Sequence, residues 1–275
     1  MMMRRSLYPP ARPQSMGEVL DAGFRLFRAT IGLCLSYGAL LVIAGELGNF
    51  YELFSGRVPR SPLELERDAA WWTWYGIGLA FTLFIWGALL KRQDALARRQ
   101  PTSMRAELLA SLRKFPQLVA LTIIAWAGIT IGLLLLIVPG VYLAVALAFG
   151  APVLFVGGAS GPIQALTESA RLVRGEWRRT AVLLIFVILI TLAADGVIAS
   201  ILTAASIAIA GVAERATIAS FSEIAGVIVG SITAPFLSAM ILAIYADLVT
   251  RAELRRKATD AGAPGIGSDA RAENR

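Results

Sequence analysis

The chain alternates between long apolar segments and short segments rich in arginine. Apolar residues fill 57% of its 275 positions, well above the share found in soluble domains. Each apolar segment is long enough for a helix to cross a bilayer, which takes about 20 residues. We therefore predict an all-α, polytopic membrane protein with six transmembrane helices, at approximately residues 30–50, 71–90, 117–138, 141–158, 181–203 and 222–249.

One reversal of direction is expected inside the uncharged run of residues 115–167. A single helix of that length would extend roughly 80 Å, well over twice the hydrocarbon thickness of about 30 Å. Pro139 and Gly140 interrupt this run: proline disfavours helical geometry in the residue before it, and glycine accepts the dihedral angles of a turn. We interpret the pair as a structural turn between the third and fourth spans. The alternative is a broken helix that lines a binding cavity.

Basic residues are distributed unevenly along this pattern. In the six-span arrangement, all but four of the 26 Lys and Arg residues fall on one side of the membrane; the exceptions are Arg57, Arg60, Arg67 and Arg215. By the positive-inside rule, the N and C termini are both cytoplasmic. The basic residues that give the formal net charge of +7 would then lie along the membrane surface. We therefore expect no nucleic-acid partner.

Short amphipathic segments precede the first, third and fifth predicted spans, at residues 16–28, 103–115 and 161–177. We expect each to be a helix lying in the cytoplasmic interface, with its basic residues near anionic phospholipids. The predicted membrane-interface residues are Arg25, Arg28, Arg113, Lys114, Arg171, Arg174, Trp177 and Arg178. Because the order of amphipathic helix, span, outer turn and span occurs three times, a threefold internal repeat is a hypothesis. The alternative is three unrelated connectors.

These segments define the domain organisation. Residues 1–15 form a basic cytoplasmic tail, residues 16–257 form the six-span membrane domain with its three units, and residues 258–275 form a disordered cytoplasmic tail. We expect residues 204–221, which are mildly apolar, to form an interfacial excursion on the outer side.

The segment from Ile137 to Thr180 also resembles a bacterial family of six-span proteins. This family takes its name from the membrane domain of glycerophosphoryl diester phosphodiesterases. The shared features are the apolar Pro–Gly–apolar–Tyr pattern at 139–142, Pro152, and the helix that carries Ser169, Gly175 and Trp177. The resemblance implies an uncharacterised protein of the bacterial plasma (inner) membrane. It implies no catalysis, because in such fusions the phosphodiesterase reaction belongs to a separate soluble domain.

Few residues are candidates for chemistry. The chain has no histidine and one cysteine, Cys34, so it cannot form an internal disulfide or a Cys/His metal site; we expect no metal and no cofactor. Asp195 is the one acid deep in a predicted span, and such a residue is by default a functional-site hypothesis. It could contact an ion or substrate. Alternatively, it could be a protonated acid hydrogen-bonded to a neighbouring helix.

The predicted function follows from these limits. We expect a non-enzymatic integral membrane protein, either a membrane scaffold or a lipid-associated component, with a membrane-protein partner or a second copy as possible partners. The alternative is a small secondary transporter or channel-like protein that uses Asp195. An enzyme is the least favoured class, because no nucleophile–base pair is recognisable.

Overall fold

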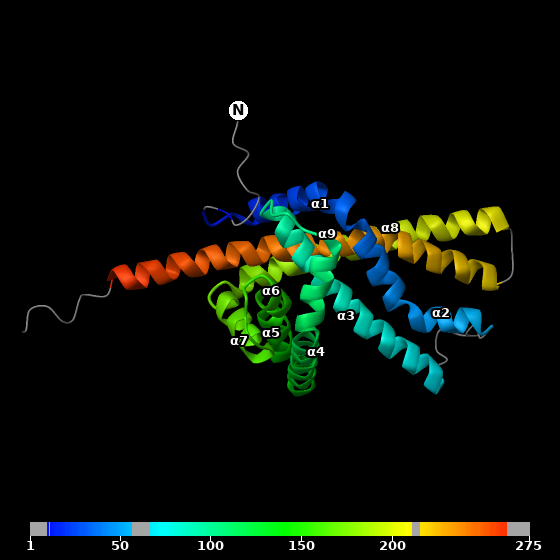
Figure 1. Cartoon of the computed structure of the whole chain (residues 1–275), viewed down its shortest axis with the longest axis horizontal. Helices are drawn as coiled ribbons and strands as arrows, with labels where there is room; N and C mark the ends of the chain where they lie inside the picture. Colours follow the sequence, from blue (N-terminus) through cyan, green and yellow to red (C-terminus); the bar gives the residue numbers. More distant parts are fainter. Residues whose placement is uncertain (1–9, 11, 57–66, 211–214, 263–275) are drawn as a thin grey trace, which may run out of the picture.

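The computed structural model describes residues 10, 12–56, 67–210 and 215–262, and the regular elements in this part of the chain are all helices (Figure 1). They are α1 (Met16–Gly45), α2 (Leu47–Phe54), α3 (Ala69–Ala97), α4 (Met104–Leu135), α5 (Ile137–Leu147), α6 (Gly150–Phe155), α7 (Pro162–Val173), α8 (Trp177–Ala210) and α9 (Arg215–Gly262). Among the described residues, six helical segments are long and apolar enough to cross a membrane, and the fourth combines α5 with α6. The predicted all-α, six-span fold is confirmed.

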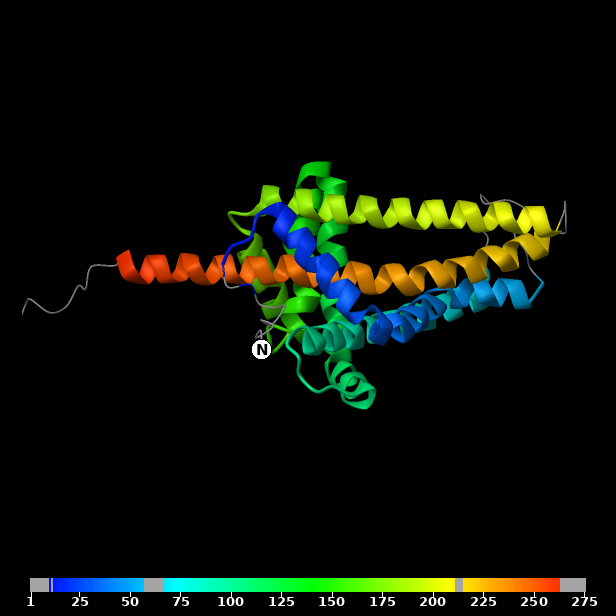
Figure 2. The same cartoon turned by 90° about the horizontal axis from the view of Figure 1, so that it is seen from above.

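The long helices pair as three consecutive hairpins: α1 with α3, α4 with α5, and α8 with α9. The hairpins diverge from one shared core, which we call the hub and which includes Leu90, Phe149, Leu183 and Met240. In both views α4 and α5 run across the long axis that α8 and α9 follow (Figures 1 and 2). Much of α4 and α8 therefore has few protein neighbours, whereas α9 packs against both α1 and α8.

The hairpins expose large apolar side chains outside the hub. Leu134 at the end of α4 is 82% exposed, Trp126 in the same helix 65%, and Leu192 in α8 61%. Buried polar residues, by contrast, include Gln93, Glu107, Ser169 and Asp247. Apolar groups outside and polar groups inside are the distribution expected of helices that face lipid.

Helix α1 packs closely against α9 at two glycines. A Cβ atom added to Gly38 would lie 2.2 Å from the Ser231 carbonyl oxygen, and one added to Gly23 would lie 2.3 Å from Sδ of Met240. Pro235 has no N–H to donate to the Ser231 carbonyl, so one backbone hydrogen bond of α9 is missing where α9 crosses α1. Gln93 of α3 donates from Nε2 to the Pro235 carbonyl oxygen at 2.8 Å, which joins all three helices.

The reversal between α4 and α5 occurs at Leu136, three residues before the predicted turn at Pro139 and Gly140. Leu136 is extended, with φ −166° and ψ 149°, and it alone separates the two helices. Pro139 lies in the first turn of α5, where a missing N–H removes no helical hydrogen bond. Gly140 lets α4 and α5 approach closely, because a Cβ atom added to Gly132 would lie only 2.9 Å from the Cα atom of Gly140.

The fourth span is itself interrupted between α5 and α6, at Ala148 and Phe149. Ser169 of α7 bridges this interruption: its hydroxyl donates to the Ala146 carbonyl oxygen at 2.7 Å and accepts from the Phe149 N–H at 3.2 Å. Ser169 is fully buried. Ser169 thus supplies hydrogen-bond partners for the Ala146 carbonyl and the Phe149 N–H, which lie at the break in the helix.

Two of the three predicted amphipathic helices are not separate elements. Residues 16–28 continue into the first span as α1, and residues 103–115 continue through Pro116 as α4. Only α7 is distinct from the span that follows, because the backbone turns at Gly175, whose φ is +87°. Glycine accepts this left-handed conformation without the strain that other residues incur.

The three amphipathic segments nevertheless share a register. Gly23, Ser111 and Ser169 occupy equivalent positions two residues before Arg25, Arg113 and Arg171, and all three are buried. Each contacts the second helix of another hairpin: Gly23 faces Met240 of α9, Ser111 donates to the Phe84 carbonyl oxygen of α3 at 2.6 Å, and Ser169 donates to Ala146 of α5. This cyclic pattern supports the repeat hypothesis.

Two predicted boundaries differ from the structure. In place of an interfacial excursion at residues 204–221, α8 continues to Ala210 and α9 begins at Arg215. Helix α9 also continues to Gly262, so residues 258–262 are helical where the disordered tail was predicted to start. The rest of that predicted tail, and most of the predicted N-terminal tail, lie outside the described residues.

Candidate functional site

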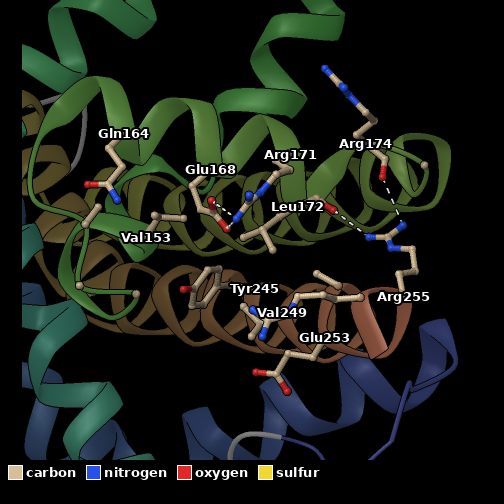
Figure 3. A pocket seen from close by; sticks show the side chains of 16 residues that line it. Val153, Gln164, Glu168, Arg171, Leu172, Arg174, Tyr245, Val249, Glu253 and Arg255 are labelled. Carbon is tan, nitrogen blue, oxygen red and sulfur yellow. Dashed lines mark hydrogen bonds and ion pairs between the residues drawn. The ribbon is translucent and has the colours of Figure 1, made fainter. Parts of the chain in front are cut away.

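A groove with a volume of about 810 Å³ lies between α7, the end of α6 and the C-terminal half of α9 (Figure 3). Apolar side chains line its floor, among them Val153, Leu172 and Val249. Its charged residues are Arg171, Arg174, Arg255, Arg256, Glu168 and Glu253. Because the arginines outnumber the glutamates, the groove favours an anionic ligand that also has an apolar part.

Helix α7 has one buried side and one side that faces the groove. It begins after Gly161 with Pro162 in its first turn. Ala165 and Leu166 are buried, whereas the side chain of Arg171 is 74% exposed. Arg171 donates to Glu168 at 2.7 Å, and such an exposed ion pair is weak enough for an arriving anion to compete for the guanidinium.

The turn after α7 is fixed to α9 by Arg255. Its Nη1 donates to the Arg174 carbonyl oxygen at 3.2 Å and its Nη2 to the Leu172 carbonyl oxygen at 3.4 Å (Figure 3). A Cβ atom added to Gly175 would lie 3.1 Å from Arg255 Nη1. The carbonyl groups that end α7 are thereby satisfied, and one wall of the groove is held in place.

An ion-pair cluster lies at the same end of the molecule. The carboxylate of Asp247 is fully buried; it accepts from Arg179 at 2.6 Å, from Arg251 at 2.8 Å and from the Gln14 N–H at 2.7 Å. Both arginines also donate to the Gln14 carbonyl oxygen at 2.7 Å. Glu176 links the cluster to the groove, since its Oε1 lies 3.5 Å from Arg251 and 3.9 Å from Arg255. The segment before α1 is therefore attached to α8 and α9.

Asp195 lies in α8, far from the groove along the chain. It is half-buried, and its Oδ1 atom is buried without a hydrogen-bond partner in the described part of the chain. An unpaired buried carboxylate oxygen is costly unless the group is protonated or a ligand reaches it. The unpaired oxygen leaves both interpretations of Asp195 open.

Most of the predicted interface residues are exposed at the charge-rich end. Arg25, Arg28, Arg113 and Arg178 are exposed, and Arg25 is paired with Asp21. Only Arg171 and Arg174 of the predicted set line the groove.

Two residues of the predicted interface set make contacts inside the protein. Lys114 donates from Nζ to the Leu154 carbonyl oxygen at 2.5 Å, near the end of α6. Trp177 donates from Nε1 to the Tyr142 carbonyl oxygen at 3.3 Å and stacks on the Tyr142 ring at 5.7 Å. Both contacts therefore join separate helices, in addition to any contact with lipid.

The largest omission in the sequence analysis is Glu107 in α4. It is 4% exposed and accepts from both Tyr37 and Thr102, and Arg92 donates to both of its oxygens at 3.1 Å. Met104 and Leu112, on the apolar side of the same segment, are exposed. Glu107 points inward, where it joins α1, α3 and α4.

Asp247 lies near the inner end of the sixth predicted span, where an interfacial acid would be expected, but it is fully buried. One signal was present in the sequence: the spacing of Asp247 and Arg251 by four residues predicts a helical ion pair. The burial of the pair depends on Arg179 and Gln14, which come from distant parts of the chain.

Comparison with known proteins adds a family. A family model described as an uncharacterised protein family, UPF0259, matches residues 77–229, more than half of the chain. The match includes α4, the interrupted fourth span, α7 and α8. No solved structure matches the chain. The chain belongs to the uncharacterised protein family UPF0259.

Proposed function

We propose that this protein is a non-enzymatic, lipid-associated membrane component that binds the headgroup of an anionic phospholipid in the groove between α7 and α9. The observation that carries the proposal is the combination of an apolar floor, at Val153 and Leu172, with arginines at Arg171, Arg174 and Arg255. Such a site matches a ligand that is charged at one end and apolar at the other.

The location of the groove supports the proposal. It lies between α7 and the C-terminal half of α9, where the arginines of α7 and those near the end of α9 come together. We propose that this end is cytoplasmic and that the membrane is the bacterial plasma membrane, as the arginine distribution and the resemblance to the phosphodiesterase membrane-domain family suggest.

The absence of catalysis is part of the same proposal. Of the two acids that line the groove, Glu168 is already paired with Arg171. The sequence supplies no histidine that could act as a general base. A binding role makes use of the arginines and the apolar floor without a reacting group.

Lipid co-purification tests the proposal. Arg171→Gln combined with Arg255→Gln removes two positive charges from the groove, so the amount of anionic phospholipid retained in mild detergent should fall several-fold. Arg25→Gln is the matched control, because Arg25 is also an exposed helical arginine paired with an acid, yet it lies outside the groove. Equal lipid retention in the double variant and the control would contradict the proposal.

A second candidate function is ion or proton transport through Asp195. The favouring observation is its buried, unpartnered Oδ1 atom. In proteoliposomes, Asp195→Asn should abolish an ion or proton flux that the wild-type chain supports. If the wild-type chain supports no flux above protein-free vesicles, this candidate is rejected.

A further inference from the structure

We infer that the groove selects an anionic phospholipid whose headgroup carries free hydroxyl groups, and that the Tyr245 hydroxyl is the residue that recognises them. This inference rests on the proposed function and specifies its ligand. It concerns the end of the groove opposite Arg174 and Arg255, where Tyr245 and Gln164 lie (Figure 3).

Tyr245 places a hydroxyl group in the wall of the groove. It is 5% exposed, and its hydroxyl makes no hydrogen bond to any described residue. In an empty groove, water can bond to this hydroxyl, which is able both to donate and to accept a hydrogen bond. A ligand in the groove would supply a partner in place of that water.

Gly157 provides the space that the hydroxyl occupies. A Cβ atom added to Gly157 would lie 2.6 Å from the Tyr245 hydroxyl oxygen, closer than real Cβ contacts allow. Any larger residue at position 157 would therefore displace the tyrosine. Gly157 lies two residues after the end of α6, so the segment that leaves α6 positions this end of the groove.

Gln164 adds a second uncharged donor at the same end. Its Oε1 atom accepts from the Ser160 N–H at 2.9 Å and from the Ser160 hydroxyl at 2.7 Å. The amide NH₂ group is left without a hydrogen bond to the described residues, and it reaches toward Val153 (Figure 3). Neutral donors suit a neutral acceptor such as a hydroxyl oxygen, whereas the guanidinium groups at the other end suit a phosphate.

Two lipids of equal charge separate headgroup recognition from charge attraction. Phosphatidylglycerol and phosphatidylserine each carry a net charge of about −1 at pH 7, but only the first presents hydroxyl groups without additional ionic groups. We expect the full chain in detergent, titrated with each lipid and followed by native mass spectrometry, to bind phosphatidylglycerol roughly tenfold more tightly, the ratio that one hydrogen bond to Tyr245 supports.

Tyr245→Phe is the decisive variant, because it removes the hydroxyl and keeps the ring that packs in the hub. It should lower phosphatidylglycerol affinity to that of phosphatidylserine, about tenfold, and leave phosphatidylserine binding unchanged. Gly157→Ala should act in the same direction. Tyr142→Phe is the control, because Tyr142 lies outside the groove.

The outcomes for the two proposals are distinct. If Tyr245→Phe keeps the preference for phosphatidylglycerol, the hydroxyl inference is wrong, while lipid binding through the arginines still stands. If wild type and Tyr245→Phe bind both lipids equally, the selectivity does not exist. If Arg171→Gln with Arg255→Gln binds both lipids as wild type does, the proposed function itself is wrong.

Discussion

Gln14 and Asp247 are 233 positions apart in the sequence, yet the Gln14 N–H donates to Asp247 Oδ1 at 2.7 Å. The same carboxylate holds Arg179 and Arg251, so one buried group attaches the segment before α1 to both helices of the third hairpin. Asp247→Asn should therefore leave the poorly exposed Arg179 without its carboxylate partner, and Arg251 with only the more distant Glu176 carboxylate. We expect a loss of about 3–5 kcal/mol in stability, measured as a lower thermal unfolding temperature in detergent.

Asp21→Asn is the matched control for that experiment. Asp21 also pairs with an arginine four residues away, but its side chain is 61% exposed. Its loss should cost only about 0–1 kcal/mol. If the two variants unfold at the same temperature, the Asp247 cluster does not stabilise the fold.

Glu107→Gln should also destabilise the protein. The substitution keeps the shape of the side chain but removes the charge that Arg92 faces at 3.1 Å in the interior. Loss of a buried partner of this kind costs about 3–5 kcal/mol. Asp94→Asn, which breaks the more peripheral pair with Arg98, provides the comparison in the same unfolding assay. An equal, small effect of both substitutions would show that Glu107 is unimportant for stability.

Gly38→Ala should separate α1 from α9. The new Cβ atom would lie 2.2 Å from the Ser231 carbonyl oxygen, a backbone atom that cannot move without shifting the helix. Overpacking of this kind costs about 1–3 kcal/mol. Gly32→Ala in the same helix meets no atom within 4 Å and should be neutral or slightly stabilising, since alanine favours helix by about 1 kcal/mol over glycine. The unfolding temperatures of the two variants in detergent separate the cost of the helix–helix clash from the gain in helix propensity.

The orientation of the hairpins is testable by cysteine labelling. Cys34→Ser removes the sole native thiol, and Gln100→Cys or Ser55→Cys then places one thiol at an exposed position on either side of the second span. A reagent that cannot cross the membrane should label Ser55→Cys in intact cells and Gln100→Cys only after the membrane is opened. Labelling of Gln100→Cys in intact cells would reverse the proposed orientation.

The sequence alone predicted those parts of the fold that depend on the lengths of the apolar segments. The six spans, and the reversal within the uncharged run, follow from residue counts and from the bilayer thickness. The reversal falls at Leu136 and not at Pro139, because proline is tolerated in the first turn of a helix. Local signals place such a turn only to within a few residues.

The candidate site was less accessible to sequence reasoning. Arg171 and Arg174 were predicted at the interface, but the floor of the groove and Tyr245 depend on α9 packing beside α7, which no local pattern encodes. Glu107 and Asp247 resembled ordinary interfacial acids because their partners come from other hairpins. Tertiary ion pairs of this kind become visible only when the helices are placed in space.

The close packing of α1 against α9 has a consequence for how the chain is synthesised. Helix α1 is synthesised well before α9, although its Gly23 and Gly38 are shaped to fit Met240 and Ser231 of α9. Until α9 enters the bilayer, that glycine face has no protein to cover it and is left to lipid or to insertion factors. Assembly of the hub is therefore a late event in biogenesis, and a ribosome stalled before Arg215 would hold a chain whose first hairpin is inserted but not yet docked.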